Sequence, residues 1–202
     1  MVLLIDNFDS FSHILADYLM QLGLELHIVR NDVSPESLLG QKWEAVILSP
    51  GPESPRKAGN LMKILGQFVE KNTPILGICL GHQAIGEYFG AKLVKGEHPV
   101  HGKVHRVFRQ CQQRLLANLP ESFEVTRYHS LIIQDEPEEF EVLLRTGDGV
   151  NMAMAHRFRP IFGIQYHPEA YLTQYGKEIL GNWLRIIKTQ KTLGISANIP
   201  HG

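Results

Sequence analysis

The fold is decided by one stretch of the sequence, Pro74-Ile75-Leu76-Gly77-Ile78-Cys79-Leu80-Gly81-His82-Gln83. Residues 74–78 are wholly apolar, which is typical of a strand buried on both faces of a parallel sheet. Residues 82–89 have the spacing of a helix. The stretch therefore predicts a strand that passes into a helix, with Cys79 at the turn between them.

The first half of the chain repeats this alternation. The expected strands are 2–5, 25–29, 45–48 and 74–78, and the expected helices are 11–22, a short one opening at 34–36, 61–69 and 82–89. Apolar strands that alternate with helices indicate a parallel sheet covered on both sides.

The second half has a different pattern. The expected strands are 104–108, 123–127, 141–145, 152–156 and 161–166, joined by turns, and an amphipathic helix is expected at 171–187. The predicted fold class is α/β, a three-layer sandwich whose mostly parallel central sheet carries an antiparallel extension. Residues 1–188 are expected to form a single domain, and residues 189–202 a frayed tail.

The composition is that of an ordinary globular protein. Of the 202 residues, 44% are hydrophobic and 20% are charged, and the formal net charge is −1. This balance lacks the basic excess of non-specific nucleic-acid binders, and nothing marks a polybasic membrane patch. No apolar run approaches the roughly 20 residues of a membrane-spanning helix.

The cysteine count bears on the compartment. Two cysteines, Cys79 and Cys111, are too few for a disulfide framework, which favours a reducing environment. Residues 1–6 lack the basic region of a signal peptide and have the pattern of a strand. We therefore expect a soluble cytoplasmic protein with no nucleic-acid or membrane partner.

Cys79 lies between two glycines at the predicted turn. A turn at the carboxyl edge of an open α/β sheet is where such sheets bind ligands and present nucleophiles. The free N–H groups and the dipole at the start of the next helix favour a thiolate. Free cysteines are also often buried core residues, so Gly-x-Cys-x-Gly alone leaves both interpretations open.

A thiol nucleophile needs a base, and Tyr166-His167-Pro168-Glu169 offers one. The motif follows a predicted strand, so His167 is expected at a sheet edge too. Glu169 lies two residues further on, where its carboxylate can orient one imidazole nitrogen while the other faces the thiol. Pro168 and Glu169 would equally suit the first turn of a helix, and both interpretations can hold at once.

A loop beside the predicted nucleophile is the candidate oxyanion site. Ser49-Pro50-Gly51-Pro52 follows the strand at 45–48, and a backbone N–H of this loop could join that of Leu80 to hold an oxyanion. Taken alone, the four residues favour an ordinary turn that ends a strand.

Six motifs in chain order resemble those of the class I (triad) glutamine amidotransferases, and the resemblance covers residues 1–187. They are Asp6-Asn7-Phe8-Asp9-Ser10-Phe11, Ser49-Pro50-Gly51-Pro52, Gly77-Ile78-Cys79-Leu80-Gly81-His82-Gln83, His101-Gly102-Lys103, Arg127-Tyr128-His129-Ser130-Leu131 and Gln165-Tyr166-His167-Pro168-Glu169. The cysteine and His-Pro-Glu motifs mark the superfamily. The first and fourth motifs resemble its chorismate-linked branch, the glutaminase subunits of anthranilate and aminodeoxychorismate synthases.

The resemblance implies a glutaminase that works through a covalent thioester. Cys79 would be the nucleophile, His167 the acid and base, and Glu169 the residue that orients His167. The residues implied in holding glutamine and its oxyanion are Gly51, Leu80, Gln83 and the backbone of Ser130 and Leu131.

The resemblance also implies a partner. The released ammonia would pass to a synthase subunit that binds chorismate and Mg²⁺, whereas this chain would hold no metal and need no cofactor. The segment His101-Gly102-Lys103 would lie on the side that communicates with that subunit. Whether anthranilate or 4-amino-4-deoxychorismate is made would depend on the partner.

Three residues depart from the family pattern. Glu53 stands where a small residue, often Gly, is usual; Ile14 replaces an Asn; and Ala170 replaces a Ser. None of the three belongs to the implied triad.

Two other functions fit the same residues. A stand-alone hydrolase of γ-glutamyl compounds would use the triad on bulkier substrates without a partner. A redox or regulatory subunit would use Cys79 as a sensor, although a sensor needs no oriented histidine. His98, His101 and His105 have a metal-like spacing, but Pro99 and Gly102 interrupt the helix that would align them, so no metal site is predicted.

Overall fold

Parallel strands form the half of the sheet that holds Cys79 in the computed structural model, which describes residues 1–97 and 100–192. The strands are β1 (Val2–Asp6), β2 (Leu26–Arg30), β3 (Val46–Leu48), β4 (Ile75–Ile78), β5 (Lys92–Lys95), β6 (Lys103–Arg109), β7 (Ser122–Arg127), β8 (Leu131–Gln134), β9 (Phe140–Thr146), β10 (Asn151–His156) and β11 (Ile161–Ile164). The α-helices are α1 (Phe11–Gln21), α2 (Leu61–Glu70), α3 (Leu80–Tyr88) and α4 (Gly176–Thr192), and short 3₁₀ helices lie at Pro35–Leu38, Pro55–Lys57 and Arg114–Leu116.

The main sheet has nine strands in the order β2-β1-β3-β4-β11-β10-β9-β6-β7. The first five in this order are parallel, and the next four continue the sheet with antiparallel pairing. The last strand of the chain, β11, lies between β4 and β10 and joins the two halves. The predicted parallel sheet with an antiparallel extension is therefore confirmed.

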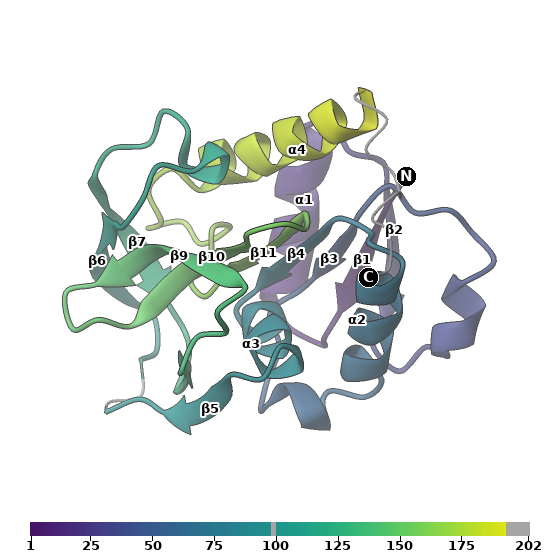
Figure 1. The fold of residues 1–202 in the computed structure, drawn as a ribbon, viewed down its shortest axis with the longest axis horizontal. Coiled ribbons are helices and arrows are strands. Elements are labelled where there is room, and N and C mark those ends of the chain that lie inside the picture. The colour runs from purple at the N-terminus through teal and green to yellow at the C-terminus, as the bar shows by residue number, and fades with distance from the viewer. Residues whose placement is uncertain (98–99, 193–202) are drawn as a thin grey trace.

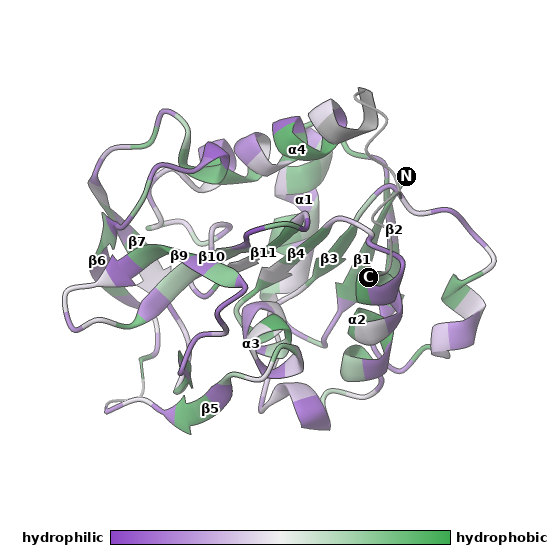
Figure 2. Cartoon of the chain, viewed as in Figure 1, coloured by the Kyte–Doolittle hydropathy of each residue, from purple (hydrophilic) through white to green (hydrophobic). Residues whose placement is uncertain are grey.

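Helices cover both faces of the sheet, which makes three layers (Figure 1). Alternate residues of β1 face opposite sides: Leu4 packs in one core with Leu19 of α1 and Trp183 of α4, whereas Leu3 packs in the other with Phe68 of α2. Apolar strands lie between helices whose outer faces are more hydrophilic (Figure 2). The sheet thus separates two apolar cores, as burial on both faces requires.

A small second sheet was not expected from the sequence. It pairs β5 with β8 in antiparallel register, and its Ile133 is buried with Ala84 and Ile85 of α3. β5 has exposed lysines at both ends, Lys92 and Lys95. The apolar stretch between them is too short to predict a strand from the sequence. The pairing brings the start of β8 to the helix that follows Cys79.

The strands of the main sheet and the first three α-helices lie within two residues of their predicted bounds, but α4 does not. It begins at Gly176 instead of residue 171, because the segment before it bonds to β7: the N–H of Gln174 donates to Glu124 O at 2.9 Å, and Gln174 Oε1 accepts from the N–H of Glu124. The helix continues to Thr192, so the predicted tail at 189–202 starts as helix. Residues 193–202 lie outside the described part of the chain.

Across residues 1–97 and 100–192, no helix combines the length and the apolar character needed to cross a membrane.

Candidate active site

Cys79 lies at the turn between β4 and α3, as the sequence predicted. Its backbone has φ 50° and ψ −98°, an unusual conformation for a residue with a side chain. The N–H of Cys79 donates to Ile164 O of β11 at 2.8 Å, which ties the turn to the neighbouring strand. Such strain costs on the order of 1–3 kcal/mol and persists where the surroundings enforce it, often at functional sites.

The close approach of α3 to β3 explains the glycine after this turn. A Cβ at Gly81 would lie 2.4 Å from Leu48 O, so any larger residue would push the helix away from the sheet. Gly81 therefore allows the N-terminal end of α3, with its free N–H groups, to pack against β3 beside Cys79.

His167 and Glu169 form a buried pair. His167 Nδ1 lies 2.7 Å from Glu169 Oε1, and the two side chains are 2% and 0% exposed. The backbone holds the pair in place, since the N–H of His167 donates to Thr126 O and its carbonyl accepts from the Thr173 hydroxyl at 2.7 Å. The contact fixes the imidazole so that Nε2 is the nitrogen left for chemistry.

Cys79 and Glu169 act together on the His167 ring. Burial lowers the pKa of His167, but the charge of Cys79, hydrogen bonding toward both residues and the charge of Glu169 outweigh it and raise the pKa to about 10. His167 Nε2 is buried and has no hydrogen-bond partner among the described residues. Catalytic hydrogen bonds often tighten only when substrate binds. The geometry suits exchange of a proton between Nε2 and a group bound at Cys79.

The loop after β3 meets the start of α3. A Cβ at Gly51 would lie 2.5 Å from Leu80 Cδ2, so the loop and the helix start are in close contact there. Leu80 is the first residue of α3, and its N–H has no acceptor within the helix. Among the described residues, neither Gly51 nor Leu80 donates a backbone hydrogen bond outside a helix or strand. Both N–H groups are thus available to an oxyanion.

A buried amide network holds this loop, which sequence reasoning did not identify. Asn7 Nδ2 donates to Ser49 O at 2.9 Å, and the N–H of Asn7 donates to the Ser49 hydroxyl. Asn31 Nδ2 in turn donates to Asn7 Oδ1 at 2.9 Å. Asn7 lies in the first quoted motif, but Asn31 lies outside every motif, and only the pairing of β1 with β2 brings the two together.

Of the residues expected to bind glutamine, Gln83 and Leu131 contact each other, whereas Ser130 is exposed. Gln83 of α3 is 3% exposed, and its Nε2 donates to Leu131 O at 3.1 Å, so these two meet. Ser130 is exposed, and its carbonyl accepts from the N–H of Gly96. The arrangement brings the start of β8 to the second turn of α3.

The predicted partner-facing segment lies close to the histidine. His101, Gly102 and Lys103 are all exposed. The His101 ring packs edge-on against Tyr128 at 5.3 Å between centroids, and Tyr128 packs against His167 at 5.1 Å. One aromatic residue therefore separates the exposed segment from the buried pair.

Tyr128 and Phe11 are side chains that the sequence did not single out individually. Phe11 packs 4.9 Å from Tyr128 and 5.0 Å from His167, measured between ring centroids. Both belong to the motifs named above, but local sequence did not indicate that the Phe11 ring and the Tyr128 phenol ring pack at this site. Together they cover the His167 ring.

Two other histidines near Cys79 are poorly suited to act as bases. Burial, the largest cause in each case, lowers the pKa of His82 and of His129 to about 3, with Arg127 also acting on His129. His129 Nε2 accepts from Arg127 Nε at 3.1 Å, and His129 Nδ1 lies 2.9 Å from Leu131 O. Both ring nitrogens of His129 are therefore occupied.

The three departures lie in different surroundings. Glu53 has φ 61°, in the left-handed region that favours glycine, and its exposed carboxylate lies 3.7 Å from Lys57 Nζ. Ile14 is 43% exposed on α1, and Ala170 is buried. The charge of Glu53 therefore has a partner within its own loop.

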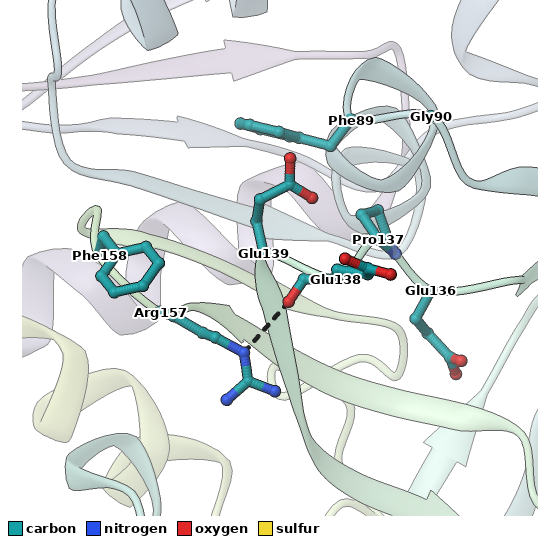
Figure 3. A pocket seen from close by; sticks show the side chains of 8 residues that line it. All are labelled: Phe89, Gly90, Glu136, Pro137, Glu138, Glu139, Arg157 and Phe158. Atoms are coloured by element: carbon teal, nitrogen blue, oxygen red, sulfur yellow. Dashed lines mark hydrogen bonds between the residues drawn. The ribbon is translucent and has the colours of Figure 1, made fainter. Parts of the chain in front are cut away.

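A cavity of about 670 Å³ lies at the far end of α3 (Figure 3). It is lined by Phe89 and Gly90, the acidic loop 136–139, and the turn at Arg157 and Phe158. Cys79 precedes the first residue of α3, whereas Phe89 and Gly90 follow its last residue, so the cavity is separate from the cysteine site.

No group of three or more His, Cys, Asp or Glu side chains gathers as a metal site would need within the described ranges. Of the three histidines with metal-like spacing, His98 lies outside those ranges.

Comparison with known proteins places the chain in a family. The model of the family described as "Glutamine amidotransferase class-I" matches residues 3–187. Anthranilate synthase component 2 of Azospirillum brasilense is 44% identical over 195 residues, covering 95% of this chain and 99% of that protein. Aminodeoxychorismate/anthranilate synthase component 2 of Bacillus subtilis is 38% identical over 193 residues, covering 94% and 98%. A crystal structure from Thermoplasma acidophilum, of a protein assigned to GMP synthase as one of its subunits, superposes with TM-score 0.87 at 29% identity and 96% coverage of both chains.

Proposed function

The chain belongs to the class I glutamine amidotransferases, and on this premise we propose that it is the glutaminase subunit of a chorismate-using synthase. It hydrolyses L-glutamine to glutamate and ammonia and passes the ammonia to its synthase partner. The observation that carries the proposal is the buried His167–Glu169 pair, 2.7 Å from Nδ1 to Oε1, acting on Cys79. The similarity to component 2 proteins of two organisms supports the role of subunit.

The first chemical step forms a thioester. The Cys79 thiolate attacks the side-chain carbonyl carbon of glutamine, and the oxyanion is held by the N–H groups of Leu80 and the Gly51 loop. Loss of one such donor typically costs about 10²–10³-fold in rate. His167, kept protonated by its raised pKa, gives its Nε2 proton to the amide nitrogen as the C–N bond breaks and ammonia leaves.

The second step frees glutamate. A water molecule attacks the thioester carbon, and His167, now neutral, takes a proton from the water. The C–O bond forms, the C–S bond breaks, and the thiolate and the imidazolium are restored. Glu169 holds the imidazole in one orientation throughout, as the third member of a triad does.

We assign the binding of the amino-acid end of glutamine to Gln83 and to the backbone of Ser130 and Leu131. The contact between Gln83 Nε2 and Leu131 O, at 3.1 Å, supports a shared subsite. Since that nitrogen is occupied, Gln83 offers a ligand its acceptor Oε1, which suits an α-ammonium group.

The acceptor chemistry belongs to the partner. Chorismate and Mg²⁺ bind the synthase subunit, and the exposed segment His101-Gly102-Lys103 faces it; anthranilate or 4-amino-4-deoxychorismate results according to the partner. Glutamine hydrolysis as written uses only groups of this chain and needs no cofactor. The reaction takes place in the cytoplasm, in keeping with the two free cysteines.

The test is the Cys79→Ser variant assembled with its synthase subunit. Synthesis from glutamine should fall to background, whereas synthesis from added ammonia should stay at the wild-type rate, because Cys79 acts only in releasing ammonia. Cys111→Ser is the matched control and should keep both activities, since Cys111 lies against Val142 of β9.

Equal loss of both activities in Cys79→Ser would contradict the proposal. Release of glutamate from γ-glutamyl peptides by the chain alone, unchanged by any synthase subunit, would favour the stand-alone hydrolase instead.

A further inference from the structure

Gln165 is a buried polar residue next to the triad that the mechanism above does not use. It follows β11 directly, is 0% exposed, and its N–H donates to Met152 O of β10 at 2.9 Å. Its side chain lies with Nε2 at 3.7 Å from Cys79 Sγ, within the range of an N–H···S hydrogen bond. The Cys79 sulfur thus accepts a hydrogen bond from the Gln165 amide.

The other end of the same carboxamide contacts Gln83. Gln83 Nε2 donates to Gln165 Oε1 at 3.2 Å and to Leu131 O at 3.1 Å. The reverse orientation of the Gln165 amide would set its oxygen against a thiolate and its N–H groups against the N–H groups of Gln83. Only one orientation therefore satisfies both contacts, and it leaves Nε2 on the sulfur.

The network continues away from the sulfur and is oriented throughout. Arg127 Nε has only hydrogens to offer and donates to His129 Nε2 at 3.1 Å, so His129 must carry its proton on Nδ1. That proton is donated to Leu131 O at 2.9 Å, the same oxygen that accepts from Gln83. Arg127 and His129 are both buried, and an oriented buried network of this kind is rigid.

We propose that Gln165 is a further catalytic residue of the glutaminase, which donates a hydrogen bond to Cys79 Sγ while its oxygen fixes Gln83. The expected effect on turnover rests on the proposed function, whereas the expected effect on alkylation of Cys79 does not. The carboxamide of Gln165 then fixes Cys79 Sγ relative to Gln83, the side chain that we assign to the binding of glutamine. Gln83, His129 and Arg127 are positioning residues, because their hydrogen bonds orient the Gln165 carboxamide.

The experiment compares Gln165→Met, which removes the donor at similar side-chain length, with the wild type. The rate at which iodoacetamide alkylates Cys79 is measured from pH 5 to 10 on the isolated chain, with Cys111→Ser as the background in every protein. The midpoint of the pH profile should rise by about one unit or more, because a hydrogen bond to the charged sulfur is lost. Gln67→Met, on the half-buried Gln67 of α2, is the matched control and should leave the midpoint unchanged.

Turnover supplies a second measurement. In the complex, Gln165→Met should lower glutamine-dependent kcat by about tenfold or more and leave ammonia-dependent synthesis unchanged. If this variant does not fold, Gln165→Glu takes its place, since it keeps an acceptor for Gln83 but, once ionised, has no hydrogen for the sulfur. In that variant the alkylation midpoint should also rise.

An alkylation profile equal to that of the wild type in either folded variant would overturn the proposal. A shifted profile in a protein whose wild type releases no glutamate with any synthase subunit would instead overturn the proposed function. In that case the contact of Gln165 with the sulfur would stand.

Discussion

At the scale of single residues, the chemistry that the site can carry out depends on which ring nitrogen of His167 is free to exchange a proton. Glu169 Oε1 occupies Nδ1 at 2.7 Å, which directs Nε2 toward Cys79. In the proposed mechanism His167 carries the proton and Glu169 orients it, so substitutions can separate the two contributions.

Replacement of Glu169 by Gln should slow turnover less than replacement of His167 by Ala. In Glu169→Gln the side-chain oxygen still accepts from Nδ1, whereas His167→Ala leaves no group to move the proton, a contribution of about 10²–10⁴-fold. Glutamine-dependent kcat of both variants in the complex is the measurement, with ammonia-dependent synthesis as the control for assembly. Near-normal turnover in His167→Ala would remove it from the triad.

The sequence predicted the places of Cys79 and His167 better than the side chains that contact them. Cys79 and His167 each follow an apolar strand, so their places at the sheet edge could be predicted. Gln165 contacts α3 and His129 contacts β8, and both contacts depend on how distant strands pair. Local sequence does not contain that register.

At the scale of elements, the boundaries that failed are those set by tertiary contacts. Residues 171–175 have apolar positions that continue a helical pattern, yet the Thr173 hydroxyl instead bonds His167 O and accepts from the N–H of Thr126. The segment forms these bonds to His167 and β7 in place of a further helical turn. Hydrophobic spacing alone cannot detect such a competing set of bonds.

The loop between β3 and α2 carries measurable backbone strain at Glu53. Replacement by Gly should raise the melting temperature by roughly 2 °C, because relief of a left-handed conformation, worth about 1–2 kcal/mol, outweighs the added freedom of the unfolded chain. Differential scanning calorimetry measures it. Lys57→Met is the control, since it removes the ion pair with Glu53 and leaves the backbone as it is. A lower melting temperature for Glu53→Gly would show that the ion pair matters more.

At the scale of the whole molecule, two buried histidines link the site to stability. Burial, with Arg127 also acting on His129, lowers the pKa of His82 and His129 from 6.5 to about 3. Both rings stay neutral in the folded protein as the pH falls below 6.5, whereas the unfolded chain takes up two protons. Stability is therefore retained above pH 6.5 and lost progressively below it.

Between pH 6 and pH 5, above the range in which most carboxylates titrate, the free energy of unfolding should fall by roughly 1 kcal/mol per pH unit for each ring. Urea denaturation at a series of pH values measures this slope. His82→Gln should lower the slope by roughly 1 kcal/mol per pH unit, the contribution of that ring, and His13→Gln, at an exposed position of α1, should leave it unchanged. A slope equal to wild type in a folded His82→Gln protein would contradict this account.

The insertion of β11 between β4 and β10 has a consequence for the order of events during synthesis. A ribosome releases the cysteine turn long before it releases residue 161, and until then β4 is an open edge with no neighbour on that side. The strand that closes the sheet also delivers Gln165 and His167. A nascent or truncated chain without β11 thus has Cys79 but not His167, and its β4 edge is apolar and unpaired. Pairing of β11 with β4 covers the edge that favours aggregation and also brings together the proposed nucleophile and its proposed base.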